Sequence, residues 1–337
     1  MAASIPPPAQ RLPADLAGPI TVELARPQET IPDQGALAGG CVYEMKWDGF
    51  RCVIVRDAAG AQLWSRQGTD LTTRFPEIAT AAVDQIPAGT VIDGEVVIWN
   101  EDRLDFDLLQ RRLVSGVARI RELVKTHQAS FVAFDLLAAA GTDLRTQPWR
   151  SRRDALERVA RWEPPLQLSP TTEDTSVARV WMADYRPAGI EGLVVKGVTT
   201  RYTPGKRNWI KVKSRATHEV IVGAVIGPLA RPETVVAGLY RGDELVIVGR
   251  TVPLTRAQSQ SLAAVLEPAA AEHPWPGTIG SGRFGGSRPP VPLTRVVPTV
   301  VAEVSADTGV QAGVWRHPLR YLRHRPDLTP TDLPTLT

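Results

Sequence analysis

Apolar and polar residues along the first 213 positions follow two periods, one typical of strands and one typical of helices. Short runs rich in β-branched and aromatic residues predict strands over residues 41–57, 61–66, 90–99, 130–138, 192–197 and 209–213. Leu, Val and Ala at helical spacing predict helices over residues 106–114 and 151–162. Such a mixture is typical of an α+β protein.

Two Asp-Gly pairs inside these runs are typical of tight turns. Asp48-Gly49 and Asp93-Gly94 predict that residues 41–57 and 90–99 each fold into two strands joined by a turn. Turns this short leave no room for helical crossovers between parallel strands, so we expect antiparallel sheets with flanking helices.

After residue 213 the pattern changes to short strands with one helix. Strands are predicted over residues 218–227, 234–242, 244–250 and 298–306, and a helix over 255–270. The OB-fold β-barrel is the most economical architecture for this order. The Gly- and Pro-rich stretch 273–292 is expected to be an irregular loop.

A chain of 337 residues is long enough for two domains at roughly 150 residues each. We expect a loose N-terminal arm over residues 1–20, which are rich in Pro and Ala, and a first domain over 21–213. A hinge over 214–218 then leads to the barrel domain, 219–337.

Composition excludes several classes of protein. Cys41 and Cys52 are the only cysteines, which excludes a disulfide scaffold and any four-cysteine zinc site. The five histidines are scattered. The sequence has no apolar run of about 18 residues and no secretory signal at its start, so we expect a cytoplasmic protein without membrane association.

The charges are unevenly distributed between the two parts of the chain. Residues 1–200 hold 22 Lys and Arg against 26 Asp and Glu, whereas residues 201–337 hold 17 against 10. The net charges are therefore −4 and +7. A basic C-terminal third favours a polyanionic partner, nucleic acid first, although a solvated basic surface would give the same count.

The most reactive arrangement centres on Lys46. A lysine amine in a pocket becomes a nucleophile when its neutral form is favoured, and attack on a phosphate also needs cations and a carboxylate-held metal. Glu95 and Glu191 stand at predicted strand ends, and Lys211 and Lys213 lie on one face of a strand. Each feature is common by itself, since most turn lysines are merely solvated.

The order of these features resembles the ATP-dependent DNA ligases of the covalent nucleotidyltransferase superfamily, in particular the small two-domain bacterial C-type and D-type repair ligases. The resemblance covers residues 40–327 and rests on six ordered motifs and a terminal basic run. They are Lys46-Trp-Asp-Gly-Phe-Arg51, Ser65-Arg66 with Arg74-Phe-Pro-Glu77, Asp93-Gly-Glu95, Phe131-Val-Ala-Phe134-Asp135, Glu191-Gly-Leu-Val-Val-Lys196, Trp209-Ile-Lys211-Val-Lys213, and the run Arg316–Asp327.

This resemblance implies an adenylation domain over 21–213 in which Lys46 takes AMP from ATP. Phe134 would stack on the adenine, close to Glu44, and Glu191 would bind Mg²⁺ or Mn²⁺ together with Glu95, which would also hold the ribose. The remaining nucleotide contacts would come from basic side chains, namely Arg51, Arg66, Lys196, Lys211 and Lys213.

Two of these cations have a further implied role. The charges of Lys211 and Lys213 should lower the pKa of Lys46. In the barrel domain, the residues implied to contact DNA or pyrophosphate are Arg316, Arg323, Arg325 and Asp327. The family's terminal motif often ends in lysine, whereas Leu328 follows Asp327 here.

The implied reaction is the sealing of 5′-phosphate/3′-hydroxyl nicks in duplex DNA through a lysyl-AMP intermediate and adenylated DNA, in repair. A monomer at the bacterial nucleoid is expected, with a repair polymerase or end-binding protein as candidate partner. With no helical DNA-binding domain before Lys46, DNA binding should be weak and salt-sensitive.

Other functions remain open from the sequence. An RNA ligase or an mRNA-capping guanylyltransferase would use the same lysine chemistry, and a catalytically inert DNA-binding module could retain the same fold. An NAD-dependent ligase is disfavoured, because that class carries a tetracysteine zinc finger.

Overall fold

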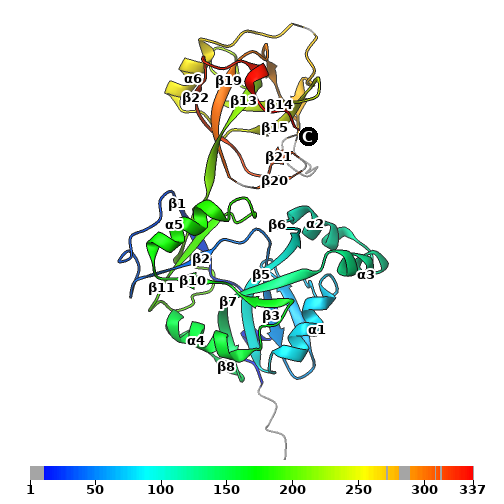
Figure 1. The fold of residues 1–337 in the computed structure, drawn as a ribbon, viewed down its shortest axis with the longest axis vertical. Coiled ribbons are helices and arrows are strands. Elements are labelled where there is room, and N and C mark those ends of the chain that lie inside the picture. Colours follow the sequence, from blue (N-terminus) through cyan, green and yellow to red (C-terminus); the bar gives the residue numbers. More distant parts are fainter. Residues whose placement is uncertain (1–10, 271, 281–288, 308, 312, 337) are drawn as a thin grey trace, which may run out of the picture. The chain divides into compact units, whose positions relative to one another are not determined.

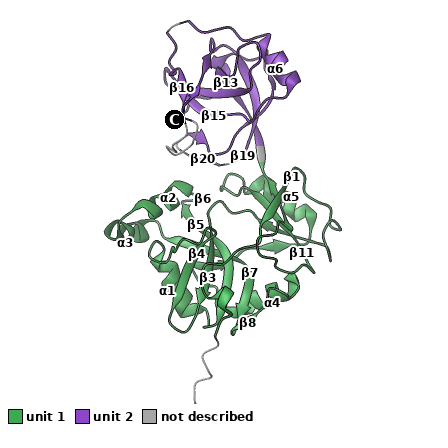
Figure 2. Ribbon diagram, turned by 180° about the vertical axis from the view of Figure 1, so that it is seen from behind, with its two compact units in different colours: residues 1–214 green, residues 215–337 purple. Residues whose placement is uncertain are grey.

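The computed structural model of the protein describes residues 11–270, 272–280, 289–307, 309–311 and 313–336. The chain forms two compact units, Met1–Ser214 and Arg215–Thr337, coloured separately in Figure 2. The boundary falls inside the segment 214–218 expected to be a hinge, and residues 215–218 belong to the first strand of the second unit.

Two sheets form the centre of the first unit (Figure 1). In order across sheet A lie β1 (Ala25–Gln28), β12 (Trp209–Lys213), β11 (Gly192–Gly197), β2 (Cys41–Met45) and β10 (Thr171–Thr172). In order across sheet B lie β4 (Ala61–Ser65), β3 (Phe50–Arg56), β5 (Thr90–Asn100), β7 (Ala129–Ala139) and β8 (Thr142–Asp143). Two short strands join sheet B at β5 and β7, namely β6 (Arg103–Leu104) and β9 (Leu166–Leu168).

Helices cover the outer faces of these sheets. Sheet B carries α1 (Pro76–Gln85), α2 (Phe106–Val114) and α4 (Trp149–Val159), and sheet A carries α5 (Thr175–Asp184). Helix α3 (Val117–Thr126) follows α2 at the outer edge of the unit (Figure 1). The predicted helices correspond to α2 and α4, and the expected α+β class with mainly antiparallel sheets is confirmed, with parallel pairing at β1–β12 and β7–β9.

Residues 11–20 are not the loose arm that their composition predicted. Leu12, Leu16 and Ile20 are buried, and a 3-10 helix spans Ala14–Leu16. These side chains pack against Phe134 and Trp209 in the core between the two sheets. The Pro- and Ala-rich segment therefore helps to build the core; residues 1–10 lie outside the described part of the chain.

Both predicted Asp-Gly turns are wrong. In each case the glycine lies where another part of the chain approaches closely, and not at a turn between two paired strands. β2 and β3 belong to different sheets, and residues 46–49 cross between them; β5 continues straight through Asp93-Gly94. Each glycine is needed for a close approach. A Cβ on Gly49 would lie 2.1 Å from the Val96 carbonyl oxygen, and one on Gly94 would lie 2.3 Å from the Phe131 ring.

The second unit is a small barrel with the strand order of an OB-fold. Its strands, in order across the sheet, are β15 (Glu244–Arg250), β14 (Thr234–Arg241), β13 (Arg215–Ile226), β19 (Val301–Asp307) and β22 (Arg320–His324). The two edges of this sheet meet where Leu319 exchanges backbone hydrogen bonds with Arg250 and Val252, which closes the barrel.

The helix of the barrel is shorter than the one predicted over residues 255–270. α6 (Arg256–Ala263) begins at a capping box on Thr255 and ends well before residue 270. Short additional pairs are β16 (Thr278–Ile279) with β17 (Val291–Pro292), and β20 (Val310–Gln311) with β21 (Val314–Trp315). β18 (Thr294–Arg295) pairs with β13, β22 was not predicted, and a 3-10 helix spans Pro330–Asp332.

Much of the stretch 273–292, expected to be a loop, falls on the undescribed residues 281–288. No helix among the described residues is long and apolar enough to span a membrane. Cys41 and Cys52 are buried and free, as small core residues should be.

Candidate active site

A cavity of about 220 Å³ opens between the two sheets of the first unit. Sheet A contributes Glu44, Lys46 and Lys211 through adjacent strands, because Glu44 faces Val194 across β2–β11 and Val194 faces Lys211 across β11–β12. Sheet B contributes the facing side chains, which are Arg51, Glu95 and Phe134. The motif residues, distant in sequence, thus meet in one cleft.

Lys46 lies just beyond β2, beside Glu191. The backbone of Lys46 continues the β2–β11 ladder, donating to Gly192 O at 2.8 Å and accepting from Glu191 N at 2.9 Å. This register brings the two side chains together, and the Lys46 ammonium donates a hydrogen bond to the Glu191 carboxylate, which is 4% exposed. The nucleophile candidate and the metal-ligand candidate therefore form one ion pair.

The expectation that Lys211 and Lys213 would lower the pKa of Lys46 is wrong, because the pKa is raised. Burial by itself lowers the pKa of Lys46, but the Glu191 carboxylate in direct contact raises it above the ordinary value. The lowered pKa belongs to Lys211, through burial and the nearby charges of Lys46 and Lys213. The closest charge, that of Glu191, therefore dominates the pKa of Lys46.

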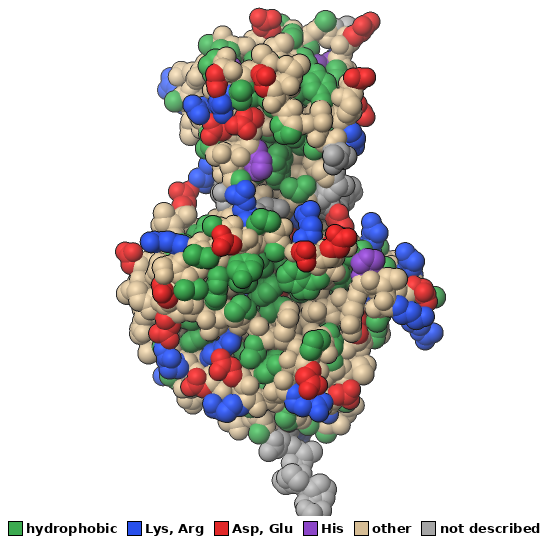
Figure 3. Space-filling model, viewed as in Figure 1, with side chains coloured by type: hydrophobic (Ala, Val, Ile, Leu, Met, Phe, Trp, Pro, Cys, Tyr) green, Lys and Arg blue, Asp and Glu red, His purple; other side chains and the backbone are tan. Residues whose placement is uncertain are grey.

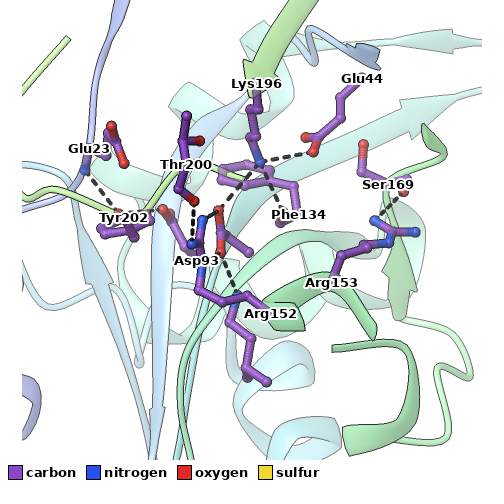
Figure 4. A network of polar contacts seen from close by, with 12 residues as sticks. Glu23, Glu44, Asp93, Phe134, Arg152, Arg153, Ser169, Lys196, Thr200 and Tyr202 are labelled. Atoms are coloured by element: carbon purple, nitrogen blue, oxygen red, sulfur yellow. Dashed lines mark hydrogen bonds and ion pairs between the residues drawn. The ribbon is translucent and has the colours of Figure 1, made fainter. Parts of the chain in front are cut away.

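Glu44 and Lys196 form a buried pair on the same face of sheet A (Figure 4). Lys196 Nζ lies 2.9 Å from Glu44 Oε1, 2.9 Å from Phe134 O and 3.7 Å from Asp135 Oδ2. Its ammonium also lies 4.7 Å from the centroid of the Phe134 ring. Lys196 lines the cavity but is fully buried, so it supports Glu44 and Phe134 from behind.

Arg51 is held rigidly on the opposite wall. Its guanidinium donates to both Asp93 oxygens, at 2.6 and 2.5 Å, and to Glu23 O at 3.1 Å. The Tyr202 hydroxyl donates to Asp93 Oδ2 at 2.7 Å (Figure 4). The guanidinium carbon also lies 4.8 Å from the centroid of the Phe134 ring. Arg51 thus braces Phe134 while it lines the cavity.

A second cavity adjoins the first and shares Arg51, Arg66 and Glu95 with it. The new lining includes Arg74, together with Ser65 at the end of β4 and Thr69 from the loop that follows. The cations and hydroxyls in this lining suit a phosphate group.

Glu95 and Glu191 fit a magnesium ion. Among the described residues the Glu95 carboxylate has no hydrogen-bond or ion-pair partner, and burial, opposed by Lys46 and Arg51, raises its pKa to about 8. The charge of Glu191 adds to this rise in the pKa of Glu95. In proteins, Mg²⁺ is commonly held by one or two carboxylates together with substrate phosphates. No group of three or more metal-binding side chains occurs in the described part of the chain.

The other predicted residues divide between the two units. Lys213 lies across from Gly192 on β12 and does not line the first cavity, although its charge acts on Lys211. In the barrel, Arg323 pairs with Glu303 at 2.8 Å. Arg325 holds Asp327 through two hydrogen bonds, which lower the pKa of Asp327 to about 2.

Arg325 also donates to Glu219 at 2.7 Å, and the backbone N–H of Arg316 donates to Gly309 O at 2.6 Å. Within the basic run, Arg323 and Arg325 are therefore neutralised locally by acidic neighbours.

Several residues of the site were missed by the sequence analysis. Leu24 and Ala25 line the cavity because β1 pairs with β12, and Arg207 lines it from the segment just before β12. Buried Glu23 accepts hydrogen bonds from the 203–208 loop. Parallel pairing between segments 180 residues apart leaves no local signal in the sequence.

Comparisons with known proteins agree with this geometry. Residues 24–213 match the family model of the ATP dependent DNA ligase domain. DNA ligase C1 of Mycolicibacterium smegmatis is 33% identical, covering 93% of this chain and 92% of its own length. DNA ligase C of Mycobacterium tuberculosis is 31% identical, covering 93% and 91%.

One solved structure supports the fold alone. It comes from a structure–function study of DNA binding with a minimal scaffold in Lig E DNA ligases, with 16% identity, a TM-score of 0.51, and coverage of 91% of this chain and 100% of that one. The two-sheet cleft and the barrel therefore define a nucleotidyltransferase of the ligase type. The chain belongs to the ATP-dependent DNA ligase family and is a ligase enzyme.

Proposed function

We propose that the protein seals nicks in duplex DNA through a covalent adenylate on Lys46. The observation that carries the proposal is the position of Lys46, in a cleft between two sheets and among two carboxylates and several cations. Membership of the ATP-dependent DNA ligase family supports ATP as the nucleotide and DNA as the partner.

In the first step, the Lys46 amine attacks the α-phosphorus of ATP. A phosphorus–nitrogen bond forms, the bond to the pyrophosphate oxygen breaks, and pyrophosphate leaves. Lys46 must first lose its proton, and Glu191 already accepts a hydrogen bond from this amine. Lys211 would stabilise the negative charge that builds up on the α-phosphate.

The adenine pocket would be formed by Phe134 and Glu44. Phe134 offers an apolar ring that Arg51 and Lys196 brace, and such a ring suits stacking on a purine. Glu44, fixed by Lys196, would accept a hydrogen bond from the base. These contacts position the α-phosphate in line with Lys46.

Glu191 and Glu95 would hold the magnesium ion, which supplies neutralisation of phosphate charge when bound. If the Glu191 carboxylate held the ion, its ion pair with Lys46, which keeps the pKa of Lys46 high, would be weakened. Lys211 and Lys213 would then favour the neutral amine that attack requires.

In the second and third steps AMP passes to the 5′-phosphate of the nick, and the adjacent 3′-hydroxyl displaces it to form the phosphodiester. The second cavity, with Arg66 and Arg74, would receive the 5′-phosphate. We further propose that the barrel serves the first step through Arg325 and Asp327 and then moves about residues 214–218 to grip DNA through Arg316 and Arg323.

A nick-sealing assay tests the proposal. Duplex DNA with a labelled 5′-phosphate at a nick should be sealed with ATP and Mg²⁺, and not with GTP or NAD. Glu191→Gln should abolish sealing while the protein stays folded by circular dichroism. Preference for GTP, or sealing of RNA nicks alone, would support a capping enzyme or an RNA ligase and contradict the proposal.

A role in DNA repair belongs to this proposal and rests on the resemblance to the C-type and D-type repair ligases. Monomeric action, with a repair polymerase or end-binding protein as partner, belongs to the same proposal.

A further inference from the structure

The turn between α2 and α3 exposes apolar side chains to solvent. Val114 is 86% exposed and Val117 is 64% exposed, whereas Ile120 and Leu123 of α3 are buried. Isolated exposed valines are common, but two neighbouring ones at a helix junction form a small apolar patch.

Exposed cations surround these valines. Residues 111–127 hold four exposed Lys and Arg side chains against a single acidic residue, Glu122. Figure 3 shows Lys and Arg gathered at the edge of the unit that α3 forms. Val117, Arg121 and Lys125 follow one another at intervals of four residues, so they line one side of the helix. The patch and its cations, here called the α2–α3 surface, comprise Arg111, Val114, Val117, Arg119, Arg121 and Lys125.

A buried arginine fixes this surface to the rest of the unit. Arg112 is fully buried, pairs with Glu77 at 2.8 Å, and donates to the carbonyl oxygens of Arg74 and His127 at 3.2 and 2.9 Å. Because these contacts tie α2 to α1 and to the end of α3, the two helices present their exposed side chains in a defined position.

The α2–α3 surface continues into the second cavity of the active site. Leu113, next to Val114, lines that cavity together with Arg66 and Arg74. The Arg74 guanidinium donates to Ser115 O, in the turn itself, at 2.5 Å. A ligand that places a phosphate in the cavity therefore meets the turn as it extends outward.

We propose that the α2–α3 surface binds the sugar–phosphate backbone of duplex DNA beside the break. The proposal rests on the proposed function, since it places the 5′-phosphate of the break in the adjoining cavity. Arg121 and Lys125 neutralise phosphates, and Val114 and Val117 pack on the deoxyribose rings between them. Charged phosphates alternate with apolar sugar surfaces along a DNA strand. A protein surface on which exposed cations have apolar neighbours complements this alternation.

The test measures the affinity of the full-length protein for nicked duplex DNA by fluorescence anisotropy at several salt concentrations. The double variant Arg121→Ala/Lys125→Ala should weaken binding by about tenfold at 100 mM salt and reduce the slope of log K against log salt by about 1.8. Val117→Ser should weaken binding while leaving that slope unchanged, because an apolar contact releases no counterions.

The matched control, Arg158→Ala/Arg179→Ala, removes two exposed cations from α4 and α5 and should leave the affinity unchanged. Self-adenylation with labelled ATP, which needs no DNA, reports whether each variant is folded. If wild type binds and seals nicked DNA but the Arg121/Lys125 variant matches the control, the proposed surface is wrong and an acidic protein partner is favoured. A wild-type protein that does not bind nicked DNA would overturn the proposed function as well.

Discussion

At the scale of single residues, the core around the nucleotide cavity is organised by neutralised charges. Asp135 and Arg152 are fully buried and joined by two hydrogen bonds, at 2.7 and 3.1 Å, directly behind the Lys196–Glu44 pair. A buried ion pair of this kind changes the free energy of folding little while it is complete, but the loss of one partner destabilises the protein strongly. The charge network therefore fixes the positions of Phe134 and Glu44.

Asp135→Asn should lower the free energy of unfolding by about 3 kcal/mol at neutral pH. Burial would raise the pKa of Asp135, but Arg152 and Lys196 overcome this effect and hold the pKa below its ordinary value. Stability from this carboxylate is therefore complete above its unfolded pKa of about 4 and is lost as pH falls below that value. Urea unfolding as a function of pH measures both effects.

The control for this prediction is Asp154→Asn, which changes an exposed carboxylate on α4. It should leave both the stability and its pH dependence unchanged. Equal acid sensitivity of wild type and Asp135→Asn would show that the pair does not contribute as described.

A sequence motif can identify a functional residue when that residue and its neighbours in the chain form a short recognisable segment. Lys46, Glu191 and Lys211 were all identified in this way; Lys46 and Lys211 line one cavity, and Glu191 pairs with Lys46. Glu23 and Arg152 were not, because their partners lie far away in sequence and buried ion pairs carry no local pattern.

At the scale of elements, the crossing from β2 to β3 determines the geometry of the site. Residues 46–49 lead from sheet A, where Lys46 extends the β2–β11 ladder, to sheet B, where Arg51 lies on β3. Gly49 permits this crossing, since only hydrogen fits against the Val96 carbonyl oxygen of β5 and the Glu95 side chain.

Gly49→Ala should impair both stability and self-adenylation. The new Cβ would lie 2.1 Å from Val96 O and 2.9 Å from Glu95 Cγ, so the segment after Lys46 must move. Overpacking of this kind costs about 1–3 kcal/mol of folding free energy. Thermal unfolding and the rate of adenylate formation are the measurements.

Gly35→Ala is the matched control, because a Cβ there meets no atom within 4 Å. It should behave as wild type. Normal adenylation by Gly49→Ala would contradict the claim that this close approach positions Lys46.

Most strands could be predicted from hydrophobic pattern, but not how they pair. The Asp-Gly signal correctly marked positions that only glycine tolerates, at residues 49 and 94, yet the requirement there is tertiary contact and not a turn. The prediction of a loose arm was also wrong for residues 11–20. It relied on the Pro-rich composition of the segment and gave too little weight to the spacing of Leu12, Leu16 and Ile20, which are buried.

At the scale of the whole molecule, the two units are expected to contribute to different steps. Arg325 and Asp327 lie on the barrel, where paired acidic groups hold the guanidinium in place. If they serve pyrophosphate release, their loss should affect only the step that involves ATP.

Arg325→Ala should therefore slow self-adenylation at least tenfold, an effect of about 1.4 kcal/mol on the barrier. The same variant should seal a pre-adenylated nick at the wild-type rate, because that step needs no ATP. Arg256→Ala, an exposed arginine at the start of α6, serves as the control. Equal slowing of both steps would assign Arg325 to DNA contact.

The central claim is that the Lys46 amine receives AMP. Incubation with ATP and Mg²⁺, followed by peptide mass spectrometry, should locate one adenylate on the peptide containing Lys46, stable to denaturation and released by acid as a phosphorus–nitrogen bond is. Lys46→Ala should carry none. Adenylate on another residue, or equal labelling of the Lys46→Ala variant, would contradict the account.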